Sequence, residues 1–286
     1  MTRQAVLLLG GEGFIGSALA QALRQQGETV YVVGRHNRGH LEDWLPLCGT
    51  VLHLASGSTP GSSARNPGLE AANIALTLRL LELLQAYPSV HLIYFSSGGT
   101  VYGNPAQIPV DEDSTIAPLS FYGAGKAAQE AFCQAARGRG LAVTIVRPSN
   151  AYGPGQSLRQ GFGLVRTMLE HARQGTQPEI WGDGEAVRDY IFIDDLVQAT
   201  LGLVRLPHDS GTYNLGSGVG HSINQVRALV EQACGMALPA SYRAARGQDV
   251  RSVVLDQSRL SRLLGWQPGV DLQTGIARCW AALQQP

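Results

Sequence analysis

Apolar positions follow two alternating rhythms through the first half of the chain. Short β-branched runs are typical of buried strands, and longer stretches with an apolar residue every three or four positions are typical of helices. The first rhythm predicts strands at Ala5–Leu9, Thr29–Val33, Thr50–Leu54, Val90–Phe95 and Ala142–Val146. The second predicts helices at Phe14–Gln26, Gly68–Ala86 and Phe121–Arg137. Strands and helices that alternate in this way form an α/β fold with a doubly wound parallel sheet.

The spacing along the chain also suggests how the fold is divided. Only about sixteen residues separate the second strand from the third, too few for a helix, a strand and a second helix, so we expect an edge strand to be missing. After Pro148 the pattern loosens, and glycines within 153–163 and 182–184 mark loops. We therefore expect a first domain over 1–155 that also receives about 188–215, and a smaller α/β lobe over 156–286. Later helices are predicted at Ile223–Ala233, Gln257–Leu264 and Leu272–Leu283.

The composition describes a folded chain without a strong global charge. Of 286 residues, 44% are hydrophobic and 15% are charged, which is enough to bury one large core or a core with a smaller lobe. Lysine plus arginine equals aspartate plus glutamate at 22 each, so no global field favours nucleic acid or an anionic membrane. Any anionic ligand must therefore be held by local groups.

The cysteines and the N-terminal segment indicate the compartment. Cys48, Cys133, Cys234 and Cys279 are scattered, with no CxxC pair and no histidine at metal-ligand spacing. We expect buried free thiols, no metal and a reducing compartment. The opening residues lack the apolar stretch and cleavage site of a signal peptide, and no run reaches the roughly 18 apolar residues of a membrane helix. These features predict a cytoplasmic protein.

A glycine-rich loop joins the first strand to the first helix. Gly10, Gly13 and Gly16 lie in the run LGGEGFIG with the spacing GxxGxxG. Such glycines form the tight turn, let the backbone approach a pyrophosphate and let the helix pack closely on the sheet, while the helix N-terminus offers amide donors to phosphate. The alternative is a tight turn without a ligand. The first domain is thus predicted to be a Rossmann domain that binds a dinucleotide, which leaves substrate binding to the lobe over 156–286.

The end of the second strand bears on the choice of dinucleotide. A carboxylate is expected there to bind both ribose hydroxyls, but this chain has Gly34, followed by Arg35 and Arg38. Because a carboxylate would repel a 2′-phosphate and arginine can hold phosphate in a bidentate manner, the pattern favours NADP over NAD. The alternative is that the two arginines form a solvated basic turn.

A tyrosine and a lysine stand one helical turn apart in the run FYGAGK. Tyr122 and Lys126 share one face at the start of a predicted helix. Ionising a tyrosine at pH 7 requires about 4 kcal/mol, and one ammonium at about 4 Å supplies about that much. Hydroxyls that could share a hydrogen bond with the tyrosine and a substrate oxygen follow a preceding strand, although some of them could only cap the strand end. These are Ser96, Ser97 and Thr100.

Several motifs in one order carry a resemblance that covers Val6 to about Pro268. They read GGEGFIG, HLAS, FSSGGTVYG, YGAGK, RPSNAYGPGQ, IWGDGEAVRDYIFIDD, YNLGSG and RSVVLDQSRLSRLLGWQP. With these motifs the chain resembles the extended short-chain dehydrogenase/reductase superfamily and its NAD-dependent epimerase/dehydratase family. Within that family it looks most like the UDP-glucose (UDP-galactose) 4-epimerases.

The resemblance implies roles for particular residues. Tyr122 would be the base, Lys126 would orient the cofactor ribose and lower the tyrosine pKa, and Thr100 would be the third catalytic residue, through its hydroxyl. Two arginines would grip the diphosphate of a sugar nucleotide; the alternative is that they pair with Asp189 and Asp249 as structural salt bridges. Other cofactor contacts would come from Phe14, Ile15, Leu54, Ala55, Ser56, Asn73, Ser96, Ser97 and Pro148. Substrate contacts would come from Ser58, Asn150, Arg188, Arg246, Asp249 and Val253, and a homodimer would form through the helices around Ala71–Leu84 and Phe121–Ala135.

Three departures from the family pattern affect these expectations. Gly98 replaces the usual hydroxyl residue after the paired serines, so the hydroxyl partner of Tyr122 must be Thr100 or Ser97. The short segment between Gly34 and Val51 lacks the aspartate that usually contacts adenine. The affinity for the cofactor is therefore expected to depend more on Arg35. Val253 stands where some epimerases have a large side chain, so the pocket could admit N-acetylated hexoses.

The same region separates neighbouring reactions. Sugar-nucleotide 4,6-dehydratases need an acid and a base where this chain has Gly99 and Thr100, and 3,5-epimerising reductases place a cysteine at the position of Gly98. The expectation is a 4-epimerase that works through a transient 4-keto sugar on a tightly bound NAD(P). The alternatives are an NADPH-dependent sugar-nucleotide reductase and a non-catalytic protein that senses dinucleotides.

Overall fold

The computed structural model describes residues 5–37, 40–159, 161–206, 209–245 and 250–285. The chain forms two compact units, each built from separate stretches of sequence. The first unit contains residues 1–97, 121–147 and 197–213. The second contains residues 98–120, 148–196 and 214–286.

The central sheet consists of β1 (Ala5–Leu9), β2 (Val30–Val33), β3 (Cys48–His53), β4 (His91–Phe95), β5 (Val143–Pro148) and β9 (Thr212–Leu215). Its strands lie in the order β2-β1-β3-β4-β5-β9, and neighbouring strands from β2 to β5 are parallel. This order confirms the predicted doubly wound α/β fold. Strands of such a sheet are covered on both faces, and β1 and β4 are accordingly buried along their whole length.

At the edge of the sheet, β2 pairs with β1, and the described residues place no strand on its other side, where the sequence predicts that one is missing. Between β2 and β3 the described residues form only the short helix α2 (Leu41–Trp44) and a turn of 3₁₀ helix at Leu45–Leu47. Beyond the end of β2, the side-chain amide of Asn37 donates to Val32 O at 2.9 Å and accepts from Gly34 N at 2.6 Å.

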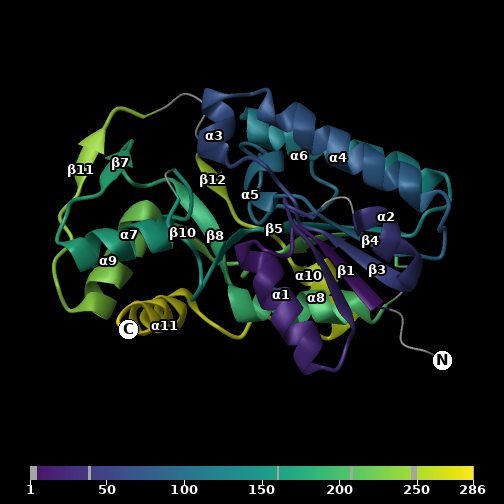
Figure 1. The fold of residues 1–286 in the computed structure, drawn as a ribbon. Coiled ribbons are helices and arrows are strands. Elements are labelled where there is room, and N and C mark those ends of the chain that lie inside the picture. Colours follow the sequence, from purple (N-terminus) through teal and green to yellow (C-terminus); the bar gives the residue numbers. More distant parts are fainter. Residues whose placement is uncertain (1–4, 38–39, 160, 207–208, 246–249, 286) are drawn as a thin grey trace. The chain divides into compact units, whose positions relative to one another are not determined.

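Helices cover both faces of this sheet. The helices α4 (Leu69–Leu84) and α6 (Phe121–Gly138) pack side by side on one face, and α1 (Phe14–Gln25) lies on the other (Figure 1). The sequence explains the packing, because α1 turns Leu19, Ala20 and Leu23 inward at helical spacing. A short helix, α3 (Pro60–Arg65), precedes α4 and starts at a capping box between Thr59 and Ser62.

The second unit has a smaller sheet around β8 (Val187–Phe192). This strand pairs antiparallel with β10 (Gly220–Ser222) and parallel with β12 (Ser252–Val253) and β6 (Asn150–Tyr152). A separate pair joins β7 (Glu179–Trp181) to β11 (Ser241–Arg243). The helices α7 (Leu164–Gln174), α9 (Ile223–Cys234) and α11 (Leu272–Leu283) pack on one another. The remaining helices are α5 (Gly98–Val101), α8 (Ile193–Val204, which continues into the first unit) and α10 (Ser258–Leu264).

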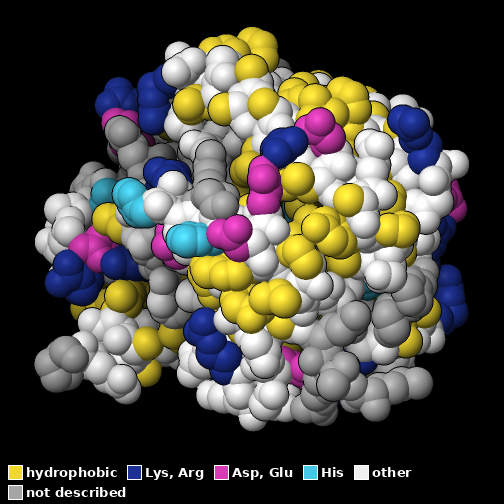
Figure 2. Space-filling view, turned by 45° about the vertical axis from the view of Figure 1, so that its right-hand side comes forward, with side chains coloured by type: hydrophobic (Ala, Val, Ile, Leu, Met, Phe, Trp, Pro, Cys, Tyr) yellow, Lys and Arg dark blue, Asp and Glu magenta, His cyan; other side chains and the backbone are white. Residues whose placement is uncertain are grey.

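The surface and the cysteines test the compositional expectations. Figure 2 shows hydrophobic side chains in patches on the visible face, with acidic and basic side chains scattered between them. All four cysteines are free; Cys48, Cys133 and Cys279 are buried as predicted, but Cys234 is only partly buried. No helix in the described ranges is both long enough and apolar enough to cross a membrane. Within the same ranges, no group of histidine, cysteine and carboxylate side chains could hold a metal ion.

Candidate functional site

The glycine loop between β1 and α1 forms a tight turn against the loop that follows β3. Gly10 has a φ of +92°, and a Cβ at this position would lie 2.6 Å from Ala55 N. A Cβ at Gly16 would lie 2.5 Å from Gly10 O, so only glycine lets α1 start this close to the loop. A Cβ at Gly13 would meet only Gly10 O, at 3.4 Å. The space in front of Gly13 is therefore open, and the first amides of α1, including those of Phe14 and Ile15, can receive a pyrophosphate.

The loop after β3 is fastened to α4 by one asparagine. Asn73 Oδ1 accepts from Gly57 N at 2.7 Å, and Asn73 Nδ2 donates to Ser58 Oγ at 2.9 Å. Ser56 Oγ donates to Ser58 O at 3.1 Å. The structure thus brings Ala55, Ser56, Ser58 and Asn73 together beside the glycine loop. The sequence predicts that Ala55, Ser56 and Asn73 contact the cofactor and that Ser58 contacts the substrate.

A carboxylate lies over the end of β2, although the strand itself ends in glycine. A Cβ built on Gly34 would overlap the carboxyl carbon and both carboxylate oxygens of Glu12. Glu12 belongs to the glycine loop, and sequence reasoning missed it; its signal was an acidic residue inside a loop expected to meet phosphate. Arg35 is exposed just after Gly34. Arg38 lies outside the described residues.

Tyr122 and Lys126 occupy the first turns of α6, as predicted. Lys126 is buried, its Nζ donates to Phe95 O at 2.8 Å at the end of β4, and it lies 5.2 Å from the centre of the Tyr94 ring. Burial lowers the pKa of Lys126 to about 8, although the carboxylates of Glu70 and Glu130 act in the opposite direction. The lysine is therefore held in place by a backbone carbonyl and keeps its charge at neutral pH.

Glu70 is a second buried carboxylate that sequence reasoning missed. It lies in the first turn of α4, and Asn73 Nδ2 donates to its Oε2 at 3.0 Å, whereas its Oε1 is buried without a hydrogen-bond partner. A Cβ on Gly125 of α6 would overlap Glu70 Oε2, so glycine is needed there for the two helices to approach. Burial raises the pKa of the Tyr122 phenol, and the negative charge of Glu70 raises it further.

A buried ion pair joins α6 to β5 one helical turn after Lys126. Arg147 holds the carboxylate of Glu130 with Nη2 at 2.7 Å and Nε at 3.1 Å. The two side chains are 3% and 1% exposed. Such a fork fixes the orientation of α6 relative to the sheet strand.

The predicted hydroxyls fall on both units. Ser96 follows β4, where its amide donates to Val146 O at 2.8 Å and its Oγ is buried without a hydrogen-bond partner. Ser97 is the last residue of that stretch of the first unit. Thr100 lies in α5 of the second unit, which begins at Gly98, and Pro148 ends β5. Ser96 and Ser97 thus belong to the same unit as Tyr122 and Lys126, whereas Thr100 belongs to the second unit.

The predicted sugar-nucleotide residues gather around β8. Asn150 is exposed, its Nδ2 donates to Asp189 O at 2.8 Å, and its side chain is in van der Waals range of a Cβ at Gly99, beside Thr100. The Arg188 guanidinium donates to Val187 O at 2.8 Å and to Val250 O. Val253 is buried on β12 in register with Arg188. Arg246 and Asp249 lie outside the described residues.

The Asp189 carboxylate binds the loop that follows β9. It accepts from Ser217 N at 2.8 Å, Ser217 Oγ at 2.9 Å, Gly218 N at 3.1 Å and Leu255 N at 3.2 Å. Burial raises the pKa of Asp189, and these hydrogen bonds act in the opposite direction. The carboxylate therefore fixes the loop at 216–218 against β8.

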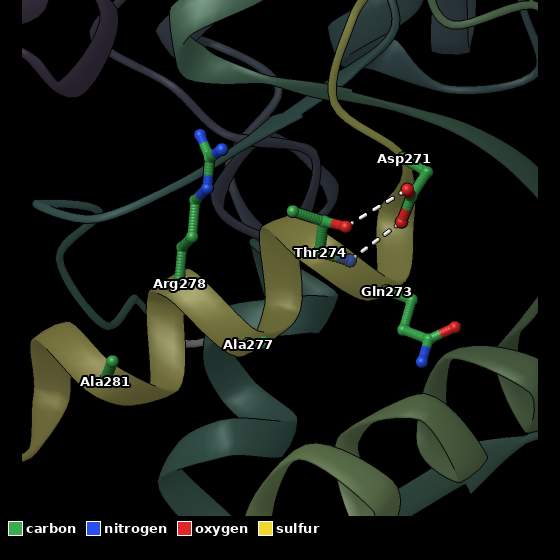
Figure 3. A pocket seen from close by; sticks show the side chains of 6 residues that line it. All are labelled: Asp271, Gln273, Thr274, Ala277, Arg278 and Ala281. Carbon is green, nitrogen blue, oxygen red and sulfur yellow. Dashed lines mark hydrogen bonds between the residues drawn. The ribbon is translucent and has the colours of Figure 1, made fainter.

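A depression of about 600 Å³ in the second unit is a poor candidate for a site. It is lined by one face of α11 and by the residue before it, namely Asp271, Gln273, Thr274, Ala277, Arg278 and Ala281 (Figure 3). Asp271 caps the helix by accepting from Thr274 N at 2.8 Å and from Thr274 Oγ1 at 3.0 Å. Its carboxylate is therefore already engaged in capping α11.

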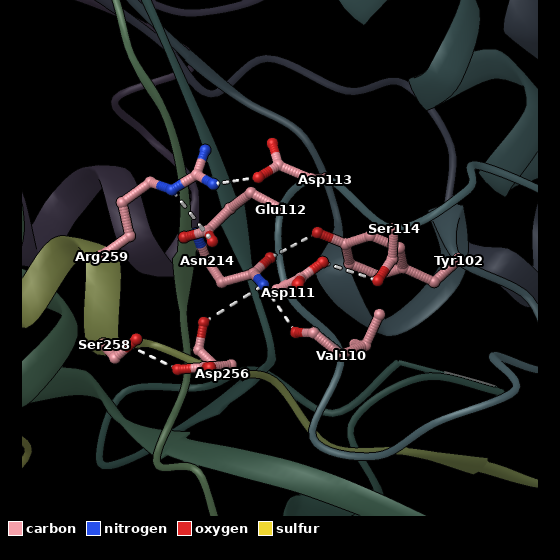
Figure 4. A network of polar contacts seen from close by, with 10 residues as sticks. All are labelled: Tyr102, Val110, Asp111, Glu112, Asp113, Ser114, Asn214, Asp256, Ser258 and Arg259. Carbon is pink, nitrogen blue, oxygen red and sulfur yellow. Dashed lines mark hydrogen bonds and ion pairs between the residues drawn. The ribbon is translucent and has the colours of Figure 1, made fainter.

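A polar network in the second unit includes Tyr102, the residue that follows α5 (Figure 4). Tyr102, two residues after Thr100, donates to Asn214 Oδ1 at 2.7 Å, and Asn214 Nδ2 donates to Val110 O at 2.9 Å. Glu112 accepts from Asn214 N at 2.9 Å and lies 3.4 Å from Arg259 Nε. Burial raises the pKa of Glu112. The network ties the segment after α5 to β9 and α10, and so helps to position Thr100.

The chain is similar to known proteins over most of its length. The model of the NAD dependent epimerase/dehydratase family matches residues 6–216. The UDP-glucose 4-epimerase of Mycolicibacterium smegmatis is 31% identical over 95% of this chain and 96% of its own length. A solved UDP-glucose 4-epimerase of Thermotoga maritima with UDP-glucose is 31% identical, with a TM-score of 0.91 over 98% of each chain. The Thermus thermophilus UDP-glucose 4-epimerase complex with NAD is 29% identical, with a TM-score of 0.88 over 98% of this chain and 99% of that one.

Proposed function

The chain belongs to the NAD-dependent epimerase/dehydratase family, and from that premise we propose that it is a nucleotide-sugar 4-epimerase. The proposal is carried mainly by one arrangement: Tyr122 and Lys126 stand on α6 beside the end of β4, in the same unit as an open glycine cradle. The similarity of UDP-glucose 4-epimerases over nearly the whole chain supports it further.

The residues of the first unit would bind the cofactor and move a proton. Tyr122 accepts the proton of the sugar 4-hydroxyl and later returns it to the 4-keto sugar. Burial and Glu70 both hold the phenol in its protonated form, so the nearby charge of Lys126 has to oppose them. The nicotinamide dinucleotide, when bound, supplies the acceptor and donor of the C4 hydride. Ser96, Ser97 and Thr100 are the hydroxyls that would orient the sugar oxygen.

The residues of the second unit would hold the sugar nucleotide. Asn150 is exposed beside Gly99, and Arg188 on β8 is held by backbone carbonyls. We assign Arg188, together with Arg246, to the diphosphate, because a fixed guanidinium binds phosphate in a bidentate manner. The small Val253 in register with Arg188 leaves room for N-acetylated hexoses. UDP-sugars are the proposed substrates, since the related Thermotoga maritima enzyme is solved with UDP-glucose.

NAD is the proposed cofactor. The related Thermus thermophilus enzyme is solved with NAD, and the preference for NADP that the Gly34–Arg35 sequence indicates has no support from the related structures. The reductase alternative rests on that preference and is weakened with it. The three buried free cysteines fit a reducing, cytoplasmic setting.

We also propose a homodimer formed through α4 and α6. Leu78 of α4 and Phe121 and Phe132 of α6 are exposed apolar side chains. A groove of about 430 Å³ lies between the later halves of the two helices. Apolar area of this kind on packed helices is typical of an isologous interface.

The experiment is to incubate the protein with UDP-glucose, UDP-N-acetylglucosamine and UDP-glucuronate and to follow the products by NMR. The expected result is interconversion of C4 epimers without net consumption of added cofactor. Tyr122→Phe should abolish it, whereas Tyr242→Phe, which removes an exposed hydroxyl bonded to Asn224, should not. Continuous consumption of reduced cofactor with a 4-keto sugar would favour the reductase. A wild type that converts none of the three sugar nucleotides would favour a non-catalytic role, and full activity of Tyr122→Phe would show that Tyr122 is not the base.

A further inference from the structure

At the end of β2, the carboxylate that the strand is expected to carry is supplied by the glycine loop. In a Rossmann domain that binds NAD, a carboxylate at the end of the second strand bonds the adenosine ribose hydroxyls. Here that position is Gly34, which has no side chain, and the carboxylate of Glu12 lies in the volume that a Cβ on residue 34 would fill. The acidic group is therefore present at this place, but it comes from the glycine loop.

We propose that Glu12 binds the adenosine ribose and makes the protein selective for NAD against NADP. This inference rests on the proposed function, because it assumes that the glycine cradle holds a nicotinamide dinucleotide. The cradle itself fits such a group, since the space in front of Gly13 is open and the first amides of α1 face it. Glu12 directly precedes Gly13, so its carboxylate stands beside the place where the pyrophosphate and the adjoining ribose would lie.

The chemistry of the carboxylate sets the sign of the selectivity. An ionised carboxylate is an acceptor only, so it can receive hydrogen bonds from both the 2′- and the 3′-hydroxyl of NAD. The 2′-phosphate of NADP carries up to two negative charges and cannot donate in this way, and the two anions would repel each other. Arg35 is exposed next to Gly34, but a guanidinium there would have to overcome Glu12 to favour NADP.

The surroundings of Gly34 show how the residue at position 34 and the carboxylate of Glu12 depend on each other. Gly34 donates its amide to Asn37 Oδ1 at 2.6 Å and is buried. Its backbone is not in the left-handed region, so another residue could adopt the same conformation. A Cβ at residue 34 would instead displace the Glu12 carboxylate from the volume that it occupies. The two positions are therefore coupled, because a side chain at residue 34 moves the carboxylate of Glu12.

The experiment measures binding of NAD and NADP by titration calorimetry, on protein freed of any dinucleotide carried through purification. The wild type should prefer NAD. Glu12→Gln should weaken NAD roughly 10- to 100-fold, the loss expected for a charge-assisted hydrogen bond, and should tighten NADP. Glu82→Gln, which removes an exposed carboxylate from α4, is the matched control and should leave both affinities unchanged.

A second pair of variants tests the exchange itself. Gly34→Asp alone should weaken NAD, because its side chain overlaps Glu12 and sets two carboxylates against each other. Gly34→Asp combined with Glu12→Ala should restore NAD binding and selectivity, since the carboxylate then comes from the strand. Circular dichroism and the thermal unfolding temperature confirm that each variant is folded.

The outcomes separate this inference from the proposed function. If the wild type binds NAD and Glu12→Gln leaves the ratio of NAD to NADP affinity within twofold, the ribose role is wrong while the epimerase proposal stands. If the double variant is no better than Gly34→Asp alone, the exchange is wrong. If the wild type binds neither dinucleotide, both proposals fail together.

Discussion

Replacing Lys126 with methionine is expected to stabilise the folded chain at neutral pH while it abolishes activity. Lys126 is 4% exposed, and burial lowers its pKa from 10.5 to about 8. Below about pH 8 the folded and the unfolded chain both hold the proton, so the folded state bears the whole cost of the buried charge. At about 1.4 kcal/mol per pKa unit, that cost is about 3 kcal/mol.

The pH dependence of this cost isolates the charge from the other effects of the substitution. Between about pH 8 and 10.5 the unfolded chain keeps a proton that the folded chain has released. The free energy of unfolding of the wild type therefore rises with pH over this range, and the advantage of the variant shrinks. The lost hydrogen bond from Nζ to Phe95 O, worth about 1 kcal/mol, reduces the gain at both ends of the range.

Urea unfolding followed by tryptophan fluorescence at pH 7 and pH 10 provides the measurement. The difference in unfolding free energy between Lys126→Met and the wild type should be larger at pH 7 than at pH 10 by about 2–3 kcal/mol. Lys126→Arg, which stays charged throughout, should show no such gain. An equal difference at the two pH values would refute the reasoning, because the buried ammonium would then carry no electrostatic cost.

Two further predictions concern the surroundings of α6. Glu70→Gln removes a carboxylate that raises the pKa of Tyr122, so the acidic limb of the profile of kcat/KM against pH should move to lower pH; an unmoved limb would show that the two groups are not coupled. Arg147→Met leaves Glu130 buried without its partner and should cost about 3–5 kcal/mol in urea unfolding. Combining Arg147→Met with Glu130→Leu should recover most of that loss, and a double variant as unstable as the single one would contradict this account.

The sequence predicts the first unit well because its signals are local. The strand Ala5–Leu9 has the predicted bounds, α1 ends one residue earlier than expected and α6 ends one residue later. Periodicity and glycine punctuation alone suffice where each element is amphipathic or wholly buried. The missing edge strand follows from chain length in the same way.

The second unit was harder to predict because its elements are short and separated by glycine-rich loops. The pattern yields neither α7 nor β8, although Gly163 and Gly175 bracket α7 with left-handed backbone and are a usable signal. The strands β6, β7, β10 and β12 have two or three residues each, too few for a period of two to emerge.

The parts of the candidate site that escaped prediction depend on contacts between distant residues. Glu70 looks like an ordinary charged residue in the first turn of a helix, but in the fold Gly125 of α6 lies against its carboxylate. Glu12 and Gly34 are separated by 22 positions, and nothing in either segment indicates that they share one volume. Tyr122 and Lys126 were found because their spacing is confined to one helical turn.

The Asn37 side chain forms hydrogen bonds with backbone groups on the edge of the sheet at β2. A parallel neighbour would use the N–H and the C=O of a single residue to bond the carbonyl of Val32 and the amide of Gly34, and the Asn37 carboxamide supplies one N–H and one C=O in their place. One side chain thereby makes the two hydrogen bonds that a residue of a further strand would make. Unpaired groups on an edge strand can pair with a strand of another molecule, so this carboxamide hinders edge-to-edge aggregation at that point.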